Sequence, residues 1–153
     1  MSSSTDRIEK QVFIQAPRRR VWRALTDPTE FGQWFRVKLA NGFSPGARTS
    51  GQVLHEGYEH LKFNVTVEQL EPQSLFSWRW NPNAIEAARD YSREATTLVV
   101  FELHDAPGGT LLKVIESGFD KLPAERRDQA FRGNENGWSI QMQNIARHVS
   151  STP

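Results

Sequence analysis

Four segments between residues 61 and 119 alternate apolar and polar residues, and this pattern restricts the fold more than any other feature of the chain. The segments read "LKFNVTVEQL", "LFSWRW", "TTLVVFELHD" and "LLKVIESGF". A period of two is typical of strands that bury one face. Turn sequences such as "EPQS" and "APGGT" separate neighbouring segments, which predicts consecutive antiparallel hairpins. Such a sheet must cover its apolar face with another element.

The C-terminal segment "NENGWSIQMQNIARHV" has the apolar stripe needed to cover that face. Its apolar residues recur at helical spacing, at Trp138, Met142, Ile145 and Val149. The preceding stretch "LPAERRDQAF" is expected to hold a separate short turn of helix that begins at Pro123. A curved sheet that grips one long helix follows from this arrangement.

The first forty residues predict one strand and two short helices. "RIEKQVFIQAP" alternates as a half-buried strand does, and Pro17 stops it. In "TDPTEFGQWF", Asp27 and Glu30 form a capping box with a proline at the first helical position. The predicted class is therefore α+β, with a curved antiparallel sheet of about six strands and two short helices after the first strand. Residues 1–6 are expected to be disordered, and residues 7–150 to form a single domain.

Charge and composition exclude several classes of protein. The chain of 153 residues has a net charge of +1 and no cysteine. A charge this small provides no general attraction for nucleic acid. No run approaches the ~18 apolar residues of a membrane span, and "MSSSTDRIEK" lacks the apolar core of a signal peptide. We therefore expect a cytoplasmic protein with no membrane span, no nucleic-acid partner and no cofactor.

Several short motifs resemble those of one known family. "VFIQAPRRRVWRALTDPTEFGQWF" resembles the opening of START-like (SRPBCC) helix-grip proteins, and more narrowly the family of homologues of the heat-shock-protein-ninety ATPase activator. The matching positions are Ala16, Pro17, Val21, Trp22, Ala24, Leu25, Asp27, Pro28 and Trp34. "FSWRW" before a loop, "ESGF", and the "GW" that opens the last helix also match. The resemblance covers roughly residues 7 to 150.

This resemblance implies a fold and a set of possible functions. Members of the family have a cavity between the sheet and the C-terminal helix, and relatives bind lipids, sterols, polyketides or plant hormones there. Some relatives are enzymes. The eukaryotic namesake is a two-domain co-chaperone, and this chain resembles its C-terminal domain. A small hydrophobic molecule is thus the expected partner, and a chaperone is a second possibility.

Large aromatic side chains fall at positions that can converge between the sheet and the last helix. The chain has 5 Trp and 9 Phe in an otherwise polar composition. Small-molecule pockets are mostly apolar and aromatic with a few polar groups. The same spacing also fits an ordinary packed core. The candidate ligand-binding residues are Trp34, Phe63, Phe76, Trp78, Trp80, Phe101, Glu116, Phe119, Trp138 and Met142.

Glu116 is the most specific of these candidates. It shares a strand face with Leu112 and Val114, so a carboxylate is expected to point toward the aromatic residues. There it would serve as a polar anchor or a general acid. In the alternative reading, the strand ends near Gly118 and Glu116 reaches water or pairs with an arginine.

The histidine motif, the arginine runs and the long connection in this sequence have ordinary structural explanations. "HEGYEH" does not predict a metal site, because His55 and His60 are five residues apart in a segment broken by a glycine. The arginines at 18–20 and 126–127 are expected to be solvated helix faces. Residues 81–95 are long for a hairpin connection and predict a short helix or a mobile flap.

Three functions are compatible with this sequence. The first is binding of a small apolar or aromatic ligand in the cavity. The second is a protein-interaction module such as a chaperone cofactor. The third is an enzyme of the cyclase or hydrolase type, which requires a second polar group facing Glu116, and no catalytic residue can be assigned. Fold analogy does not choose among them.

Overall fold

The computed structural model describes residues 6–86 and 89–151. The first strand is followed by two short helices, then by the remaining strands and finally by the long helix. In order, the elements are β1 (Arg7–Ile14), α1 (Arg18–Thr26), α2 (Pro28–Phe35), β2 (Val37–Leu39), β3 (Arg48–Val53), β4 (Lys62–Glu71), β5 (Leu75–Trp80), β6 (Thr97–Ala106), β7 (Gly109–Ser117), the 3-10 helix η1 (Phe119–Lys121) and α3 (Ala124–Ser151).

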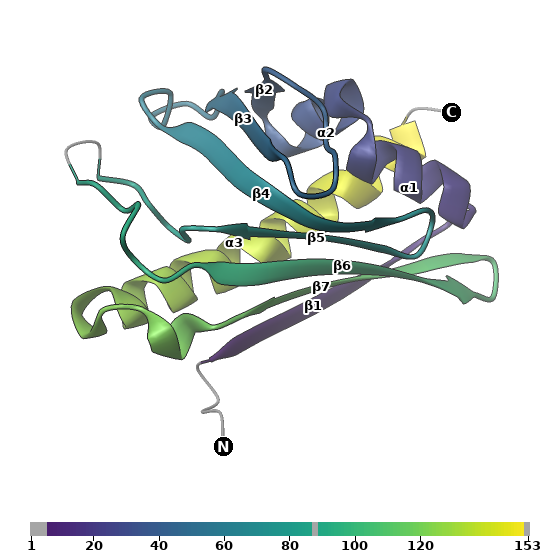
Figure 1. Cartoon of the computed structure of the whole chain (residues 1–153). Helices are drawn as coiled ribbons and strands as arrows, with labels where there is room; N and C mark the ends of the chain where they lie inside the picture. The colour runs from purple at the N-terminus through teal and green to yellow at the C-terminus, as the bar shows by residue number, and fades with distance from the viewer. Residues whose placement is uncertain (1–5, 87–88, 152–153) are drawn as a thin grey trace.

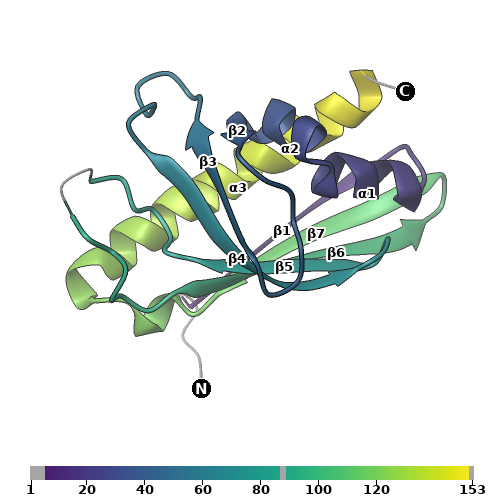
Figure 2. The same cartoon turned by 45° about the horizontal axis from the view of Figure 1, so that its top comes forward.

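The strands form one antiparallel sheet in the order β1-β7-β6-β5-β4-β3-β2. The sheet is curved, and α3 runs along one of its faces (Figure 1). The two short helices α1 and α2 lie beside the C-terminal part of α3 (Figure 2). The predicted α+β class, with a curved sheet around a long C-terminal helix, is confirmed.

Local signals place the elements that frame the interior. The Asp27 carboxylate accepts a hydrogen bond from the backbone N–H of Glu30 at 3.0 Å, so the predicted cap of α2 forms. On β4 the alternating residues Phe63, Val65 and Val67 are buried, whereas the intervening positions are exposed. The sheet therefore has one apolar face toward α3 and one polar face toward water.

Two details differ from the sequence prediction. The sheet has a seventh strand, β2, whose three residues are too few to show an alternating pattern. The segment from residue 124 onward is one continuous helix instead of a short turn followed by a main helix. Arg126 and Ala130 are buried and extend the stripe that Trp138 belongs to at intervals of four residues. This packing outweighs the low helix propensity of Gly133 and Gly137.

Two segments singled out in the sequence lie partly outside the described residues. The predicted disordered segment 1–6 lies outside the described residues except for Asp6, whose carbonyl accepts from the backbone N–H groups of Gly118 and Phe119. In the described parts of 81–95 the chain forms turns and no helix. Within the described ranges, no helix combines the length and apolar character that crossing a membrane requires.

Candidate functional site

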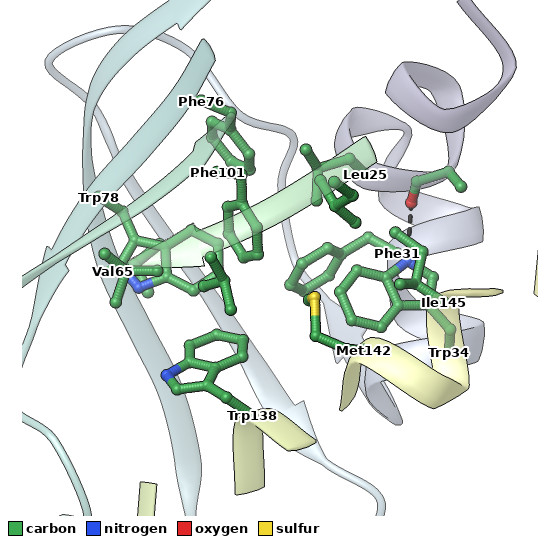
Figure 3. Close-up of a cluster of buried hydrophobic side chains, with 14 of the residues drawn as sticks. Leu25, Phe31, Trp34, Val65, Phe76, Trp78, Phe101, Trp138, Met142 and Ile145 are labelled. Carbon is green, nitrogen blue, oxygen red and sulfur yellow. Dashed lines mark hydrogen bonds between the residues drawn. The ribbon is translucent and has the colours of Figure 1, made fainter. Parts of the chain in front are cut away.

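Most of the predicted site residues form a packed aromatic cluster between the sheet and α3 (Figure 3). Phe76, Trp78 and Phe101 on the sheet are fully buried. The rings of Trp78 and Trp138 lie with their centroids 6.4 Å apart, and those of Phe101 and Trp138 are 5.6 Å apart. Direct ring contact between the sheet and α3 means that this part of the interior is filled by protein.

The tryptophans of the cluster differ in how their indole N–H groups are paired. Trp34 Nε1 donates to the carbonyl of Ala24 at 2.8 Å, which is the dashed line in Figure 3. Trp80 and Trp138 both donate to the carboxylate of Glu116. The Trp78 N–H is buried and has no hydrogen-bond partner among the described residues.

Glu116 lies near the end of β7, opposite Ile8 of β1 and Val99 of β6, with none of its surface exposed. Four groups donate hydrogen bonds to its carboxylate. Oε1 accepts from Trp138 Nε1 at 2.7 Å and from Asn134 Nδ2 at 2.9 Å. Oε2 accepts from Trp80 Nε1 at 2.8 Å and from Thr97 Oγ1 at 2.5 Å. In the described structure Glu116 is therefore neither exposed to water nor paired with an arginine, so the alternative reading of this residue is wrong.

The Glu116 network joins β5, β6 and α3 through neutral donors. In the described part of the chain no cation contacts the carboxylate, so hydrogen bonds alone compensate for its burial. Both oxygens are occupied, and Trp80 and Trp138 lie in front of them on the side of the groove described next. In this arrangement the carboxylate fixes the orientation of two indole rings and does not itself face an open space.

A groove of about 740 Å³ runs along α3 beside this network. Its walls come from α2, from the end of β3 and the loop after it, from the last residue of β5, and from one face of α3. The lining residues are Gln33, Trp34, Phe35, Arg36, Val53, His55, Tyr58, Leu61, Trp80, Asn134, Gly137, Trp138, Ile140, Gln141, Asn144, Arg147, His148 and Ser151. Ile140 is 53% exposed and Tyr58 46% exposed, so the groove is open to solvent at its rim.

The groove includes three of the ten predicted site residues, Trp34, Trp80 and Trp138. Glu116 lies directly behind it. Phe63, Phe76, Trp78, Phe101 and Met142 belong to the buried core, and Phe119 packs against Phe131 with ring centroids 5.5 Å apart. Ligand binding by any of the ten stays a prediction.

Gly137 leaves open space in the wall of this groove. A Cβ atom at this position would meet no atom within 4 Å, so neither a close backbone approach nor a turn requires glycine. Glycine inside a helix costs about 0.5–1 kcal/mol relative to alanine. The helix is therefore less stable here than it could be, and the result is additional free volume beside Trp138.

A charged cluster centred on Glu30 lies behind His148, at the end of the groove near the C-terminus of α3. Glu30 accepts from Arg20 at 2.8 Å, from Arg23 at 2.7 Å and pairs with His148 Nε2 at 2.9 Å. Partial burial opposes ionisation of Glu30, but the hydrogen bonds from His148, Arg20 and Arg23 outweigh it and lower the pKa of this carboxyl. The cluster binds α1, α2 and α3 together at one wall of the groove.

The prediction of a solvated helix face at Arg126 is wrong. Arg126 is only 4% exposed and pairs with Glu94 at 2.8 Å. Its other N–H groups donate to the carbonyls of Pro82 and Asn83, and its guanidinium lies 4.6 Å from the ring centre of Tyr91. Arg126 thus fastens the described parts of the 81–95 connection to the first turn of α3.

Burial opposes ionisation of Glu94, but hydrogen bonds from Arg126 and Arg89 lower its pKa below the ordinary value. The sequence contained a signal for Arg126, because the position continues the stripe of Ala130 and Trp138 at intervals of four. Thr97 and Asn134 were also missed, and no local pattern marks them as partners of Glu116. Among the described residues, no group of three or more His, Cys, Asp or Glu side chains is placed to hold a metal ion.

Comparisons with known proteins agree with this architecture. Protein MLL2253 from Mesorhizobium loti superposes with a TM-score of 0.76 and 24% identity, over 96% of this chain and 98% of that one. DynU16, a protein of the dynemicin biosynthetic locus, gives 0.73 and 24% over 95% of this chain and 47% of its own. The Aha1 dimer from Colwellia psychrerythraea gives 0.70 and 15% over 94% and 95%. At these identities the likeness shows the fold alone.

The family follows from a separate comparison of sequence. No match was found among curated proteins. A family profile described as "Activator of Hsp90 ATPase homolog 1-like protein" matches residues 15–150, which is most of the chain. This chain therefore belongs to the family of Activator of Hsp90 ATPase homolog 1-like proteins.

Proposed function

We propose that the protein binds a small hydrophobic or aromatic molecule in the groove beside α3. The observation that carries this proposal is the pairing of the three groove tryptophans. Trp34, Trp80 and Trp138 all donate their indole N–H to protein acceptors, so the ring surface that reaches the groove is apolar. Most of it comes from the partly buried Trp80, since Trp34 and Trp138 are each 3% exposed. A site built of fixed aromatic rings with polar groups at its rim is the usual form of a small-molecule pocket.

The Glu116 network supports this proposal because it holds two rings in place before any ligand arrives. A preorganised site loses less conformational entropy on binding than a flexible one. The open volume beside Gly137 provides room next to those rings. The similarity to DynU16 is consistent with a role near small-molecule metabolism, since that protein belongs to a biosynthetic locus. A cytoplasmic location stays a prediction.

Filling the groove from α3 tests the proposal. Phenylnaphthylamine is a neutral aromatic dye whose fluorescence rises in apolar surroundings, and binding to the wild-type protein should be saturable. In Gly137→Phe the new ring occupies the free volume at Gly137, so we expect at least tenfold weaker binding, about the 1.4 kcal/mol that corresponds to that factor. The matched control is Gln143→Phe, which adds the same ring to an exposed position of α3 outside the groove.

Two results would overturn the proposal. One is the absence of saturable dye binding to the wild-type protein. The other is equal binding by Gly137→Phe and Gln143→Phe, because the dye would then bind elsewhere. Circular dichroism of both variants shows whether α3 remains folded.

A second candidate function, docking of a protein partner such as a chaperone, is favoured by the apolar rim of the groove. Ile140 and Tyr58 line the groove and are about half exposed, and Leu54, which directly follows the lining residue Val53, is 48% exposed. Exposed apolar residues that surround a concavity are typical of interaction sites. Stimulation of a chaperone ATPase by the wild-type protein, lost in Ile140→Asp, would support this candidate. No stimulation, together with saturable dye binding, would leave the small-molecule proposal as the explanation of the groove.

A further inference from the structure

Among the described residues that line the groove, some side chains are positive and none is negative, and from this we infer that the ligand is an amphipathic anion. Such a molecule has an apolar body and one carboxylate, sulfonate or similar group. The inference rests on the proposed function, because it specifies the chemical class of the molecule that the same groove binds.

The charge of the groove comes from two arginines. Arg36 and Arg147 both line it, and no aspartate or glutamate is present among its described lining residues. Within the described ranges, neither guanidinium forms a hydrogen bond or an ion pair. Arg126 and Arg89, in contrast, are engaged by carboxylates of their own. Arg36 and Arg147 therefore remain available to pair with an anion from outside the chain.

Two carboxylates directly behind the lining residues are already engaged elsewhere. Glu30 lies behind His148 and pairs with Arg20 and Arg23. Glu116 lies behind Trp80 and Trp138 and accepts their N–H groups. Neither one contacts Arg36 or Arg147 in the described structure, so neither neutralises the positive charge of the groove.

The positions of the charges define how a ligand would lie. Arg147 is nine residues beyond Trp138 on α3, which at 1.5 Å per residue places its backbone about 14 Å further along the helix axis. Arg36 follows Phe35, whose carbonyl accepts a hydrogen bond from Gln141 between those two positions. An apolar body would rest against Trp80 and Trp138, and the anionic group would point toward Arg36 and Arg147.

The backbone at Arg36 allows a clean test of its side chain. Arg36 ends α2 in the left-handed conformation, with φ 65° and ψ 58°, where glycine is the usual residue. Arg36→Gly therefore removes the guanidinium without imposing a new backbone conformation. Arg147 is exposed on α3, and Arg147→Gln keeps a long polar side chain there.

Two dyes that differ in one group separate this inference from the proposed function. Anilinonaphthalene sulfonate has the same aromatic rings as phenylnaphthylamine and adds a single negative charge. The measurement for each protein is a ratio, the affinity for anilinonaphthalene sulfonate divided by the affinity for phenylnaphthylamine. We expect that ratio to fall about fivefold in Arg36→Gly and in Arg147→Gln, the upper range for an exposed ion pair. It should also fall in the wild-type protein as salt is raised to about 0.5 M.

The control is Arg132→Gln, which removes a positive charge from an exposed part of α3 outside the groove. Its ratio should match that of the wild-type protein. If the ratio is unchanged in Arg36→Gly and Arg147→Gln, or falls as much in Arg132→Gln, the inference is wrong even though the neutral dye binds. If neither dye binds saturably, the proposed function fails and the inference falls with it.

Discussion

Two glutamates of this protein are removed from water in opposite ways. Glu116 accepts from two indoles, a hydroxyl and an amide, and no cation contacts it in the described structure. Glu94 lies between two guanidinium groups, those of Arg126 and Arg89. The first carboxylate is satisfied by neutral hydrogen bonds and the second by charge.

The two kinds of hydrogen-bond partner, neutral for Glu116 and cationic for Glu94, match the different elements that each network connects. The partners of Glu116 come from β5, β6 and α3, so its network connects the sheet to the helix and orients two tryptophans of the groove. Glu94 and Arg126 connect a long irregular segment to the start of α3. Directional neutral donors suit a site in which ring orientation matters, whereas an ion pair suits the attachment of a connection that has few apolar contacts.

Removing the acceptor at Glu116 should have the largest effect. Glu116→Leu leaves two indole N–H groups, the Thr97 hydroxyl and the Asn134 amide without their partner. Each buried unsatisfied group costs about 1–3 kcal/mol, so we expect a loss of about 4 kcal/mol in the free energy of unfolding, measured by urea denaturation. A loss below about 1 kcal/mol would mean that leucine packing compensates and that the network contributes little to stability.

Removing the cation at Arg126 should have the next largest effect. Arg126→Met keeps much of the side-chain volume but leaves Glu94 with Arg89 alone, and it leaves the carbonyls of Pro82 and Asn83 without their donor. We expect a loss of about 3 kcal/mol in the same urea experiment, the lower range for breaking a buried ion pair. In Arg132→Met, which breaks an exposed pair on the same helix, the loss should stay below about 0.5 kcal/mol.

Glu116→Gln sharpens the comparison, because it keeps the shape of the side chain and changes only its hydrogen-bonding groups. Glutamine has one acceptor oxygen and an NH₂ group, so about half of the donors would face another donor. We expect a loss of about 2 kcal/mol in unfolding free energy. The tryptophan emission should also change, since one of the two indoles, that of Trp80 or that of Trp138, loses its acceptor. An unchanged emission spectrum with wild-type stability would contradict the positioning role of Glu116.

The sequence predicted the direction of Glu116 but not its environment. Strand parity places it with Leu112 and Val114, and the residue is indeed buried on that face. Its partners depend on the rotation of α3 against the sheet, which fixes where Asn134 and Trp138 lie and leaves no trace in local periodicity. The fold class was predictable because strand alternation and helix spacing are local signals.

The groove was predicted less well than the fold. Its three tryptophans were identified, but Trp78 and Phe101 pack against Trp138 of α3, with Phe76 stacked on Phe101, and these rings fill the expected cavity. Packing density between layers cannot be inferred from a pattern of residue types, since the same pattern fits a filled and an empty interior. The ion pair of Arg126 could not be predicted, because its partner Glu94 lies in an irregular segment whose sequence has no periodicity.

Acid pH should test the charge of the pair formed by Glu94 and Arg126, with the smallest but most selective effect. Because the pKa of Glu94 is lowered in the folded protein, the unfolded chain binds more protons in acid. The stabilisation by Arg126 is thus complete above the pKa of the unfolded chain and is lost as pH falls through the folded value, from about pH 5 downward. The difference in unfolding free energy between the wild-type protein and Arg126→Met should shrink between pH 7 and pH 3. Glu30, whose pKa is also lowered, contributes to both proteins and cancels in that difference. A difference that stays constant with pH would show that Arg126 stabilises the fold through its bonds to the carbonyls of Pro82 and Asn83 and not through its charge.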